Sequence, residues 1–205
     1  MTKIKICGLT REQDAVYCLE KGADFLGFIF VPSSPRFIEP EKAAAITVKL
    51  REYVKRPTLV GVFRDASPEY VREIAALTGI DAVQLHGSET DEQIRAIGLP
   101  AIKAFRVGAE LPDTGGHPSA EWVLFDTFDE RRVGGTGRHF DWSLLANYPR
   151  NKPFFLAGGI RPDNVAAAIS LVRPDAIDIA SGVEVEPGIK DLAKLDELFE
   201  RVKPR

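Results

Sequence analysis

Long apolar runs are what this sequence most plainly lacks. No stretch approaches the roughly 18 uninterrupted apolar residues that a membrane-spanning helix needs. The opening residues, MTKIKICGLT, contain lysines where a signal peptide would have its apolar core. We therefore expect a soluble, cytoplasmic protein without a membrane partner.

Cysteine and blocks of like charge are also scarce. The two cysteines, Cys7 and Cys18, are too few for a disulfide framework and lack the Cys/His spacing of a zinc site. The 27 basic and 30 acidic residues give a formal net charge of -3 and are mixed along the chain. Nucleic acid attracts concentrated positive charge. The sequence therefore predicts no metal site and no nucleic-acid partner.

What the chain does contain suits one folded domain. Hydrophobic residues make up 44% of its 205 residues, which is enough for one substantial core and rather few for two. No linker or low-complexity segment interrupts it. We expect a single domain over residues 1–205.

Short β-rich apolar runs alternate with stretches of helical periodicity, the pattern of repeated strand–helix units around a parallel sheet. We predict about eight strands, the number that closes a (β/α)8 barrel. They cover residues 3–7, 24–30, 58–63, 81–85, 101–106, 121–126, 153–157 and 175–180. The unit count and chain length favour closure, and an open doubly wound sheet is the structural alternative.

Helices are predicted between most of these strands, several of them opened by proline or an acidic residue. They cover residues 11–21, 40–53, 68–77, 91–97, 142–146, 162–171 and 192–202. The segment VGAELPDTGGHPSAE after the fifth strand contains prolines, glycines and few apolar positions. We expect a loop or one irregular turn there, so the helix after strand five is short or absent.

Polar groups at the carboxyl ends of barrel strands face the active site, so these positions matter most. The first strand ends with Lys5, Ile6 and Cys7, and two-residue alternation puts Lys5 and Cys7 on one face. Cys7 is therefore predicted to point into the barrel mouth, although by position alone it is equally well a small buried hydrophobe. Cys18 lies mid-helix on an apolar stripe and is expected to be structural.

Three further strands carry polar residues. Asp126 follows the apolar run WVLF, where a carboxylate is costly to desolvate unless it is paired or functional; a helix cap or solvated loop residue is the alternative. Gln84 and His86 share one face of strand four, and His86 is a ligand, a proton carrier or a polar wall residue. Asp178 lies in the last strand, which pairs with the first in a closed barrel, so we predict a buried Lys5–Asp178 ion pair.

Glycine-containing loops follow strands seven and eight. They contain Gly158 and Gly159 in one loop and Ser181 and Gly182 in the other. Glycine lets backbone N–H groups approach an anion, and barrels commonly bind phosphate at these two loops; simple turns are the alternative. Gly135, in the GGTG loop after strand six, is added to the predicted phosphate-binding set, and that loop either closes over substrate or is an exposed connector.

These segments together resemble one family. KICGLT, GFIFVPSSPRFI, AVQLHG, LFD with its GGTG loop, HFDWSLL, LAGGI and DIASGVE follow the order and spacing of phosphoribosylanthranilate isomerases over nearly the whole chain. Singly, most of these motifs are weak. The resemblance implies a (β/α)8-barrel enzyme of tryptophan biosynthesis. The family converts N-(5'-phosphoribosyl)anthranilate to 1-(2-carboxyphenylamino)-1-deoxyribulose 5-phosphate by an Amadori rearrangement.

The resemblance also implies roles for individual residues. Cys7 is the general base, Asp126 the general acid and Arg36 the cation that meets the anthranilate carboxylate, although a loop arginine is by default a solvated charge. The other substrate-binding candidates are Gln84, His86 and Asp178.

The expected chemistry needs two proton transfers. An Asp donates the proton that opens the furanose ring, and a thiolate whose pKa is lowered by a cation such as Lys5 accepts the proton from C2'. The anthranilate nitrogen supplies the electron push through a protonated Schiff base, so no metal or organic cofactor is expected.

Two other interpretations remain. The isomerase that performs the same Amadori chemistry in histidine biosynthesis has an Asp where this chain has Cys7. A non-catalytic phosphate-binding barrel would not need Cys7 and Asp126 to face one another. The expected partner is a small phosphorylated substrate, bound by a monomer or homodimer.

Overall fold

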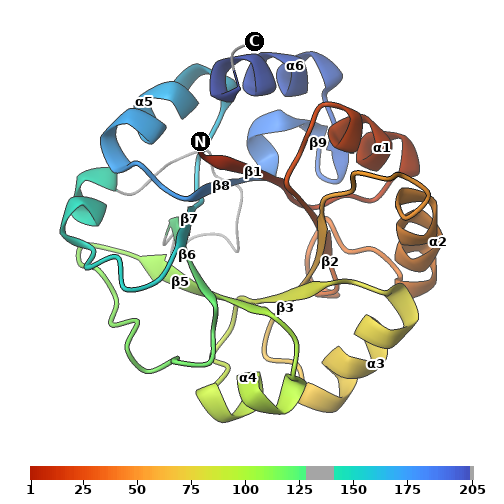
Figure 1. Ribbon diagram of the computed structural model, residues 1–205, viewed down its shortest axis with the longest axis horizontal. Coiled ribbons are helices and arrows are strands. Elements are labelled where there is room, and N and C mark those ends of the chain that lie inside the picture. Colours follow the sequence, from red (N-terminus) through yellow and green to blue (C-terminus); the bar gives the residue numbers. More distant parts are fainter. Residues whose placement is uncertain (128–140, 204–205) are drawn as a thin grey trace.

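Parallel strands close into a barrel in the computed structural model, which describes residues 1–127 and 141–203. Each strand pairs with its neighbour in the sequence, and the last pairs with the first. The strands form the inner ring in Figure 1. They are β1 (Lys3–Ile6), β2 (Phe25–Ile29), β3 (Thr58–Phe63), β4 (Ala82–Leu85), β5 (Ala101–Val107), β6 (Trp122–Thr127), β7 (Phe154–Leu156) and β8 (Ala176–Ile179). Closure is confirmed, and the open sheet is excluded.

Helices form the outer ring of Figure 1 and follow the predicted pattern closely. Their bounds are α1 (Glu12–Glu20), α2 (Pro40–Leu50), α3 (Pro68–Thr78), α4 (Asp91–Ile97), the 3-10 helix η1 (Trp142–Asn147), α5 (Pro162–Val172), the 3-10 helix η2 (Ser181–Val183) and α6 (Leu192–Val202). Residues 108–121, between β5 and β6, contain only turns, bends and irregular chain. The prediction that this helix is short or absent is confirmed.

The helix starts follow the expected chemistry. Proline occupies the first turn of α2, α3 and α5, where its missing N–H removes no helical hydrogen bond. The Thr90 side chain accepts from the Gln93 N–H, and the Gln93 side chain accepts from the Thr90 N–H, which closes a capping box on α4. These local signals explain why the helix positions could be read from the sequence. None of the helices in the described part of the chain is both long and apolar enough to cross a membrane.

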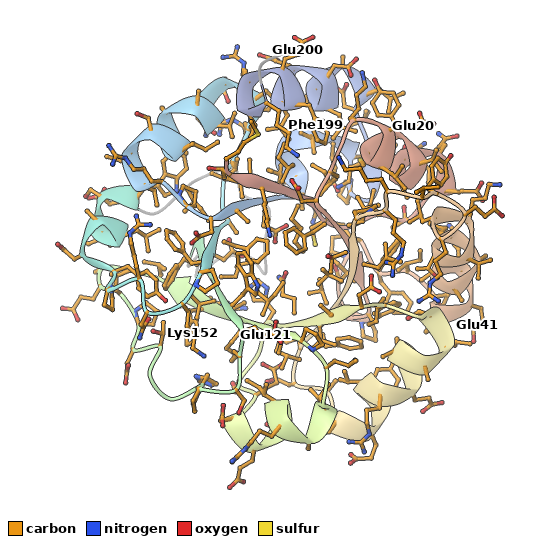
Figure 2. The ribbon with its side chains drawn as sticks, in the orientation of Figure 1. Glu20, Glu41, Glu121, Lys152, Phe199 and Glu200 are labelled. Atoms are coloured by element: carbon orange, nitrogen blue, oxygen red, sulfur yellow. The ribbon has the colours of Figure 1, made fainter. Side chains whose placement is uncertain are left out.

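Two apolar layers surround the barrel wall. The outer layer packs the strands against the helices; Figure 2 shows Phe199 of α6 directed at the wall, with Glu20, Glu41 and Glu200 at the periphery. The inner layer fills the barrel. Its aromatic members are Phe25, Trp122 and Phe155, whose ring centroids lie 4.9 to 6.0 Å apart. Phe25 and Trp122 begin their strands. The cluster of these three rings, which we call the aromatic plug, therefore fills the amino-terminal end of the barrel, and polar side chains lie at the carboxyl end.

A two-stranded antiparallel hairpin follows β8 and was not predicted. It consists of β9 (Glu184–Glu186) and β10 (Ile189–Lys190). In Figure 1 β9 lies between α1 and α6. Thr10 donates a hydrogen bond of 2.6 Å to the Gly188 carbonyl, and Lys194 of α6 donates one of 2.9 Å to the Glu184 carbonyl. The hairpin therefore lies against the loop that follows β1.

A buried ion pair fixes the loop after β4. Lys103 of β5 contacts Glu89 at 3.1 Å and donates to the carbonyls of Leu85 and Gly87. The Glu89 carboxylate also accepts from the Asp65 and Gly87 N–H groups at 2.8 and 2.9 Å. Every charge and most lone pairs in this network are satisfied, which is the condition for burying an ion pair.

We expect Lys103→Met to lower the free energy of unfolding by about 3 kcal/mol, because the Glu89 carboxylate would remain buried without its cation. Equilibrium urea unfolding measures this loss. Lys49→Met is the matched control. It removes an ion pair whose side chains are 45% and 61% exposed, and such pairs contribute less than about 1 kcal/mol. Equal losses in the two variants would contradict the assigned role of Lys103.

Candidate active site

The seam between β1 and β8 carries a buried ion pair. Lys5 and Asp178 are partners in the strand register, and Lys5 Nζ lies 2.9 Å from Asp178 Oδ1. Both side chains are buried, so the predicted pair is confirmed. Burial on its own lowers the pKa of Lys5, but attraction to Asp178 and to Cys7 raises it overall, so Lys5 stays a cation.

Cys7 lies at the carboxyl end of β1, beside this pair. A Cβ atom at Gly27 of β2 would lie 2.7 Å from Cys7 Sγ and 3.2 Å from Lys5 Nζ. Gly27 is two residues beyond Phe25 of the aromatic plug, on the same face of its strand. The absence of a side chain at Gly27 therefore makes room for the thiol and the ammonium group inside the barrel mouth, where Cys7 was predicted to point.

The acidity of Cys7 differs from the expectation. Burial raises the pKa of the thiol, and this outweighs the lowering by Lys5; Asp178 raises the pKa further, and Lys190 lowers it. The prediction that a nearby cation brings the Cys7 pKa below its ordinary value is wrong. Lys5 is present as expected, but Asp178 offsets its charge. Cys18 fits its structural assignment: it is buried in α1, and burial raises its pKa to about 12.

The acidity of the Cys7 thiol can be measured by alkylation, because only the thiolate reacts. In the unaltered protein we expect the rate for Cys7 to keep rising beyond the ordinary thiol pKa of 9.0. Asp178→Asn removes a negative charge that disfavours the thiolate, so the profile should move to lower pH. Mass spectrometry after iodoacetamide treatment across pH reports both cysteines, and Cys18 serves as the internal control. A shift of the Cys7 profile to higher pH would contradict this electrostatic account.

Asp126 and His86 meet from β6 and from the end of β4. His86 Nε2 lies 3.4 Å from Asp126 Oδ2, and Gln84 Nε2 lies 3.3 Å from His86 Nδ1. A Gln84 amide that donates to Nδ1 leaves the imidazole proton on Nε2, facing the carboxylate. The Asp126 side chain is only partly exposed, and the residue belongs to β6 itself. The alternative of a helix cap or loop residue is therefore wrong.

Arg36 is held by an acidic partner. Its Nε and Nη2 atoms donate to the Glu184 carboxylate at 2.7 to 3.0 Å. The guanidinium side chain is only 11% exposed, so the default of a solvated surface charge is wrong. A Cβ atom at Gly8 would lie 2.7 Å from Arg36 Cδ. Arg36 therefore lies across the loop that begins at Cys7.

Sequence reasoning missed Glu184 and Lys190. Lys190 Nζ donates to Glu184 Oε1 at 2.8 Å and to the Cys7 carbonyl at 2.6 Å. Burial on its own raises the pKa of Glu184, but hydrogen bonds from Arg36 and Lys190 lower it overall, so the carboxylate is ionised. The only available signal was the charge pattern of GVEVEPGIK, which resembles that of an exposed turn.

The two predicted phosphate loops lie against each other. Gly158 and Gly159 have φ values of 80° and 69°, a left-handed conformation that glycine adopts without strain, just before α5. A Cβ atom at Gly182 would overlap the Ile160 carbonyl oxygen. Only glycine permits this approach of the loop after β8 to the loop after β7. Ser181 begins η2 beside them, and Gly135 lies outside the described residues.

The structure thus places Cys7, Gln84, His86, Asp126 and Asp178 at or near the carboxyl ends of barrel strands. Over residues 1–127 and 141–203, no group of three or more His, Cys, Asp and Glu side chains is arranged to hold a metal ion. Ionisable side chains and glycine loops gathered at this end of a closed barrel define the architecture of (β/α)8-barrel enzymes.

Comparison with known proteins identifies the family. Residues 4–201 match the model of N-(5'phosphoribosyl)anthranilate (PRA) isomerase. An N-(5'-phosphoribosyl)anthranilate isomerase from Geobacter metallireducens is 42% identical over 204 residues, which cover 99% of this chain and 100% of the relative. The chain belongs to the phosphoribosylanthranilate isomerase family.

Solved structures of phosphoribosyl anthranilate isomerases are similar to this chain over its full length. A phosphoribosyl anthranilate isomerase from Thermotoga maritima is 39% identical with a TM-score of 0.90, over the full length of both chains. Another isomerase structure of this name is a complex with reduced 1-(o-carboxyphenylamino)-1-deoxyribulose 5-phosphate; it is 37% identical with a TM-score of 0.83, again over both full chains.

Proposed function

We infer that this chain catalyses the Amadori rearrangement of N-(5'-phosphoribosyl)anthranilate to 1-(2-carboxyphenylamino)-1-deoxyribulose 5-phosphate, in tryptophan biosynthesis. The assignment of this reaction rests on the family match, which covers residues 4–201. The observation that carries the mechanism is the position of a buried thiol directly after β1, beside the Lys5–Asp178 pair, with a carboxylate on β6 at the same end of the barrel.

Asp126 acts as the general acid. It donates a proton to the furanose ring oxygen while the anthranilate nitrogen pushes its lone pair toward C1', so the C1'–O bond breaks and a protonated Schiff base forms. His86, 3.4 Å from the carboxylate, holds Asp126 toward the barrel mouth. Gln84 keeps the His86 proton on the side that faces the carboxylate.

Cys7 acts as the general base. Its sulfur takes the proton from C2', and the electrons of that C–H bond form the C1'=C2' double bond of the enolamine, which then tautomerises to the C2' ketone. A thiol with a raised pKa is mostly protonated in the free protein but is a stronger base once ionised. The positive charge of the Schiff base, together with Lys5, stabilises the thiolate when substrate is bound.

Other residues hold the substrate. The free N–H groups of Arg36 meet the anthranilate carboxylate, and Asp178 and Gln84 line the ribose site. Backbone N–H groups of the Gly158–Gly159 and Ser181–Gly182 loops hold the 5'-phosphate near the start of α5. These are the loops that Gly182 allows to pack together.

We propose that residues 1–205 act as one catalytic domain in the cytoplasm, as a monomer or homodimer. The substrate nitrogen supplies the electron push, and side chains supply both proton transfers. The mechanism therefore calls on no metal or organic cofactor.

We predict that Cys7→Ala and Asp126→Asn each lower kcat by at least about 100-fold, with smaller changes in KM, because each removes one proton transfer. The fluorescence of phosphoribosylanthranilate reports its consumption. Cys18→Ala is the control, because this buried thiol lies in α1 and should leave kcat unchanged. A Cys7→Ala enzyme with near-normal turnover would eliminate the base assignment.

For Arg36→Ala we predict mainly weaker substrate binding, with KM at least about tenfold higher and kcat affected less, since an arginine–carboxylate contact exists in both ground and transition states. Steady-state kinetics with the same substrate measure both constants. An unchanged KM would count against this role for Arg36.

A further inference from the structure

The Glu184 carboxylate of the β9–β10 hairpin lies between two cations, Arg36 and Lys190. Arg36 donates to it through Nε and Nη2 at 2.7 to 3.0 Å, and Lys190 donates at 2.8 Å. The Gly188 N–H adds a fifth hydrogen bond at 3.2 Å. The Glu184 and Lys190 side chains are buried. The carboxylate is therefore fixed by contacts from three directions.

Glu184 takes only one edge of the guanidinium group. A guanidinium has two edges that can bind a carboxylate in bidentate fashion, Nε with Nη2 and Nη1 with Nη2. Glu184 occupies the first, and no acceptor in the described part of the chain hydrogen-bonds Nη1 of Arg36. The second edge, Nη1 with the outer N–H of Nη2, is therefore available to a second carboxylate in the same plane.

The charge balance points the same way. Arg36 and Lys190 carry two positive charges against the single negative charge of Glu184. This cluster, which we call the hairpin triad, therefore keeps an excess of one positive charge. Lys190 links it to the Cys7 carbonyl, and the Arg36 stem lies against Gly8. A ligand with one carboxylate would balance the excess next to the candidate base.

We propose that Glu184 is a positioning residue: by holding one edge of Arg36 it aims the other edge at the carboxylate on the aryl ring of the substrate. It thereby sets the preference for anthranilate over an aryl amine without a carboxylate. This proposal rests on the proposed function. It adds Glu184 to the determinants of specificity, with no direct contact to substrate.

The test compares two competing substrates. Phosphoribosylanthranilate is assayed for kcat and KM, and phosphoribosylaniline, which lacks only the ring carboxylate, is measured as its competitor. A competitor reports its affinity whether or not it turns over. The variants are Glu184→Gln, which keeps size but not charge, and Glu186→Gln, which alters an exposed carboxylate on the same strand.

We expect Glu184→Gln to raise KM for phosphoribosylanthranilate at least about tenfold with kcat within about threefold, while affinity for phosphoribosylaniline stays the same. Glu186→Gln should change neither. Equal weakening toward both compounds, or a loss of kcat with no change in KM, would overturn the proposal, because a merely structural role does not distinguish the two substrates.

Glu184→Asp guards against a variant that fails to fold. It keeps the charge and shortens the side chain, so we expect a KM for phosphoribosylanthranilate between those of the unaltered enzyme and Glu184→Gln. A KM at least as high as that of a folded Glu184→Gln would contradict the proposal, as would an unaltered KM.

The unaltered enzyme distinguishes a failure of the proposed function from a failure of the role of Glu184. If it fails to convert phosphoribosylanthranilate the proposed function fails, whereas normal turnover without selective loss in the Glu184 variants refutes only the role of Glu184.

Discussion

The ion pair between Lys5 and Asp178 is the interaction on which the site depends. It forms only when β1 pairs with β8, so it exists only in the closed barrel. A buried pair is tolerable when its geometry is good. This pair keeps the Lys5 cation beside Cys7, and the Asp178 charge opposes the effect of that cation on the thiol. Burial therefore decides the direction of the Cys7 pKa. The raised pKa favours the neutral thiol over the thiolate.

The hairpin after β8 adds further contacts to the loop that contains Cys7. Lys190 reaches the Cys7 carbonyl, and Glu184 joins Lys190 to Arg36. The loop after β1 is consequently held from both sides, by the barrel seam and by the hairpin triad. The triad joins two cations to one carboxylate, so the same contacts that fix the loop leave one positive charge in excess beside it.

The barrel tolerates the missing helix after β5 because its strands remain well paired there. The β5–β6 register covers six residue pairs, from Ile102 with Trp122 to Val107 with Thr127. Lys152 donates to the carbonyls of His117 and Pro118 and ties the irregular segment to the barrel. The aromatic cluster of Phe25, Trp122 and Phe155 fills the amino-terminal end of the barrel, and the polar side chains of the candidate site lie at the opposite, carboxyl end.

Most of the fold and part of the site could be predicted from the sequence. Helix starts, strand order and the trimmed segment depend on propensities and periodicities that lie within a few residues of chain. Two-residue alternation placed Lys5 and Cys7 on one face, and closure then predicted the Lys5–Asp178 pair. The tertiary structure alone decided the rest. Arg36 and Glu184 are separated by 148 positions, and no local pattern encodes that contact. The direction in which the Cys7 pKa shifts also depends on the balance of burial, Lys5 and Asp178. Electrostatic energies depend on distances and solvent exposure, and these exist only in the folded chain.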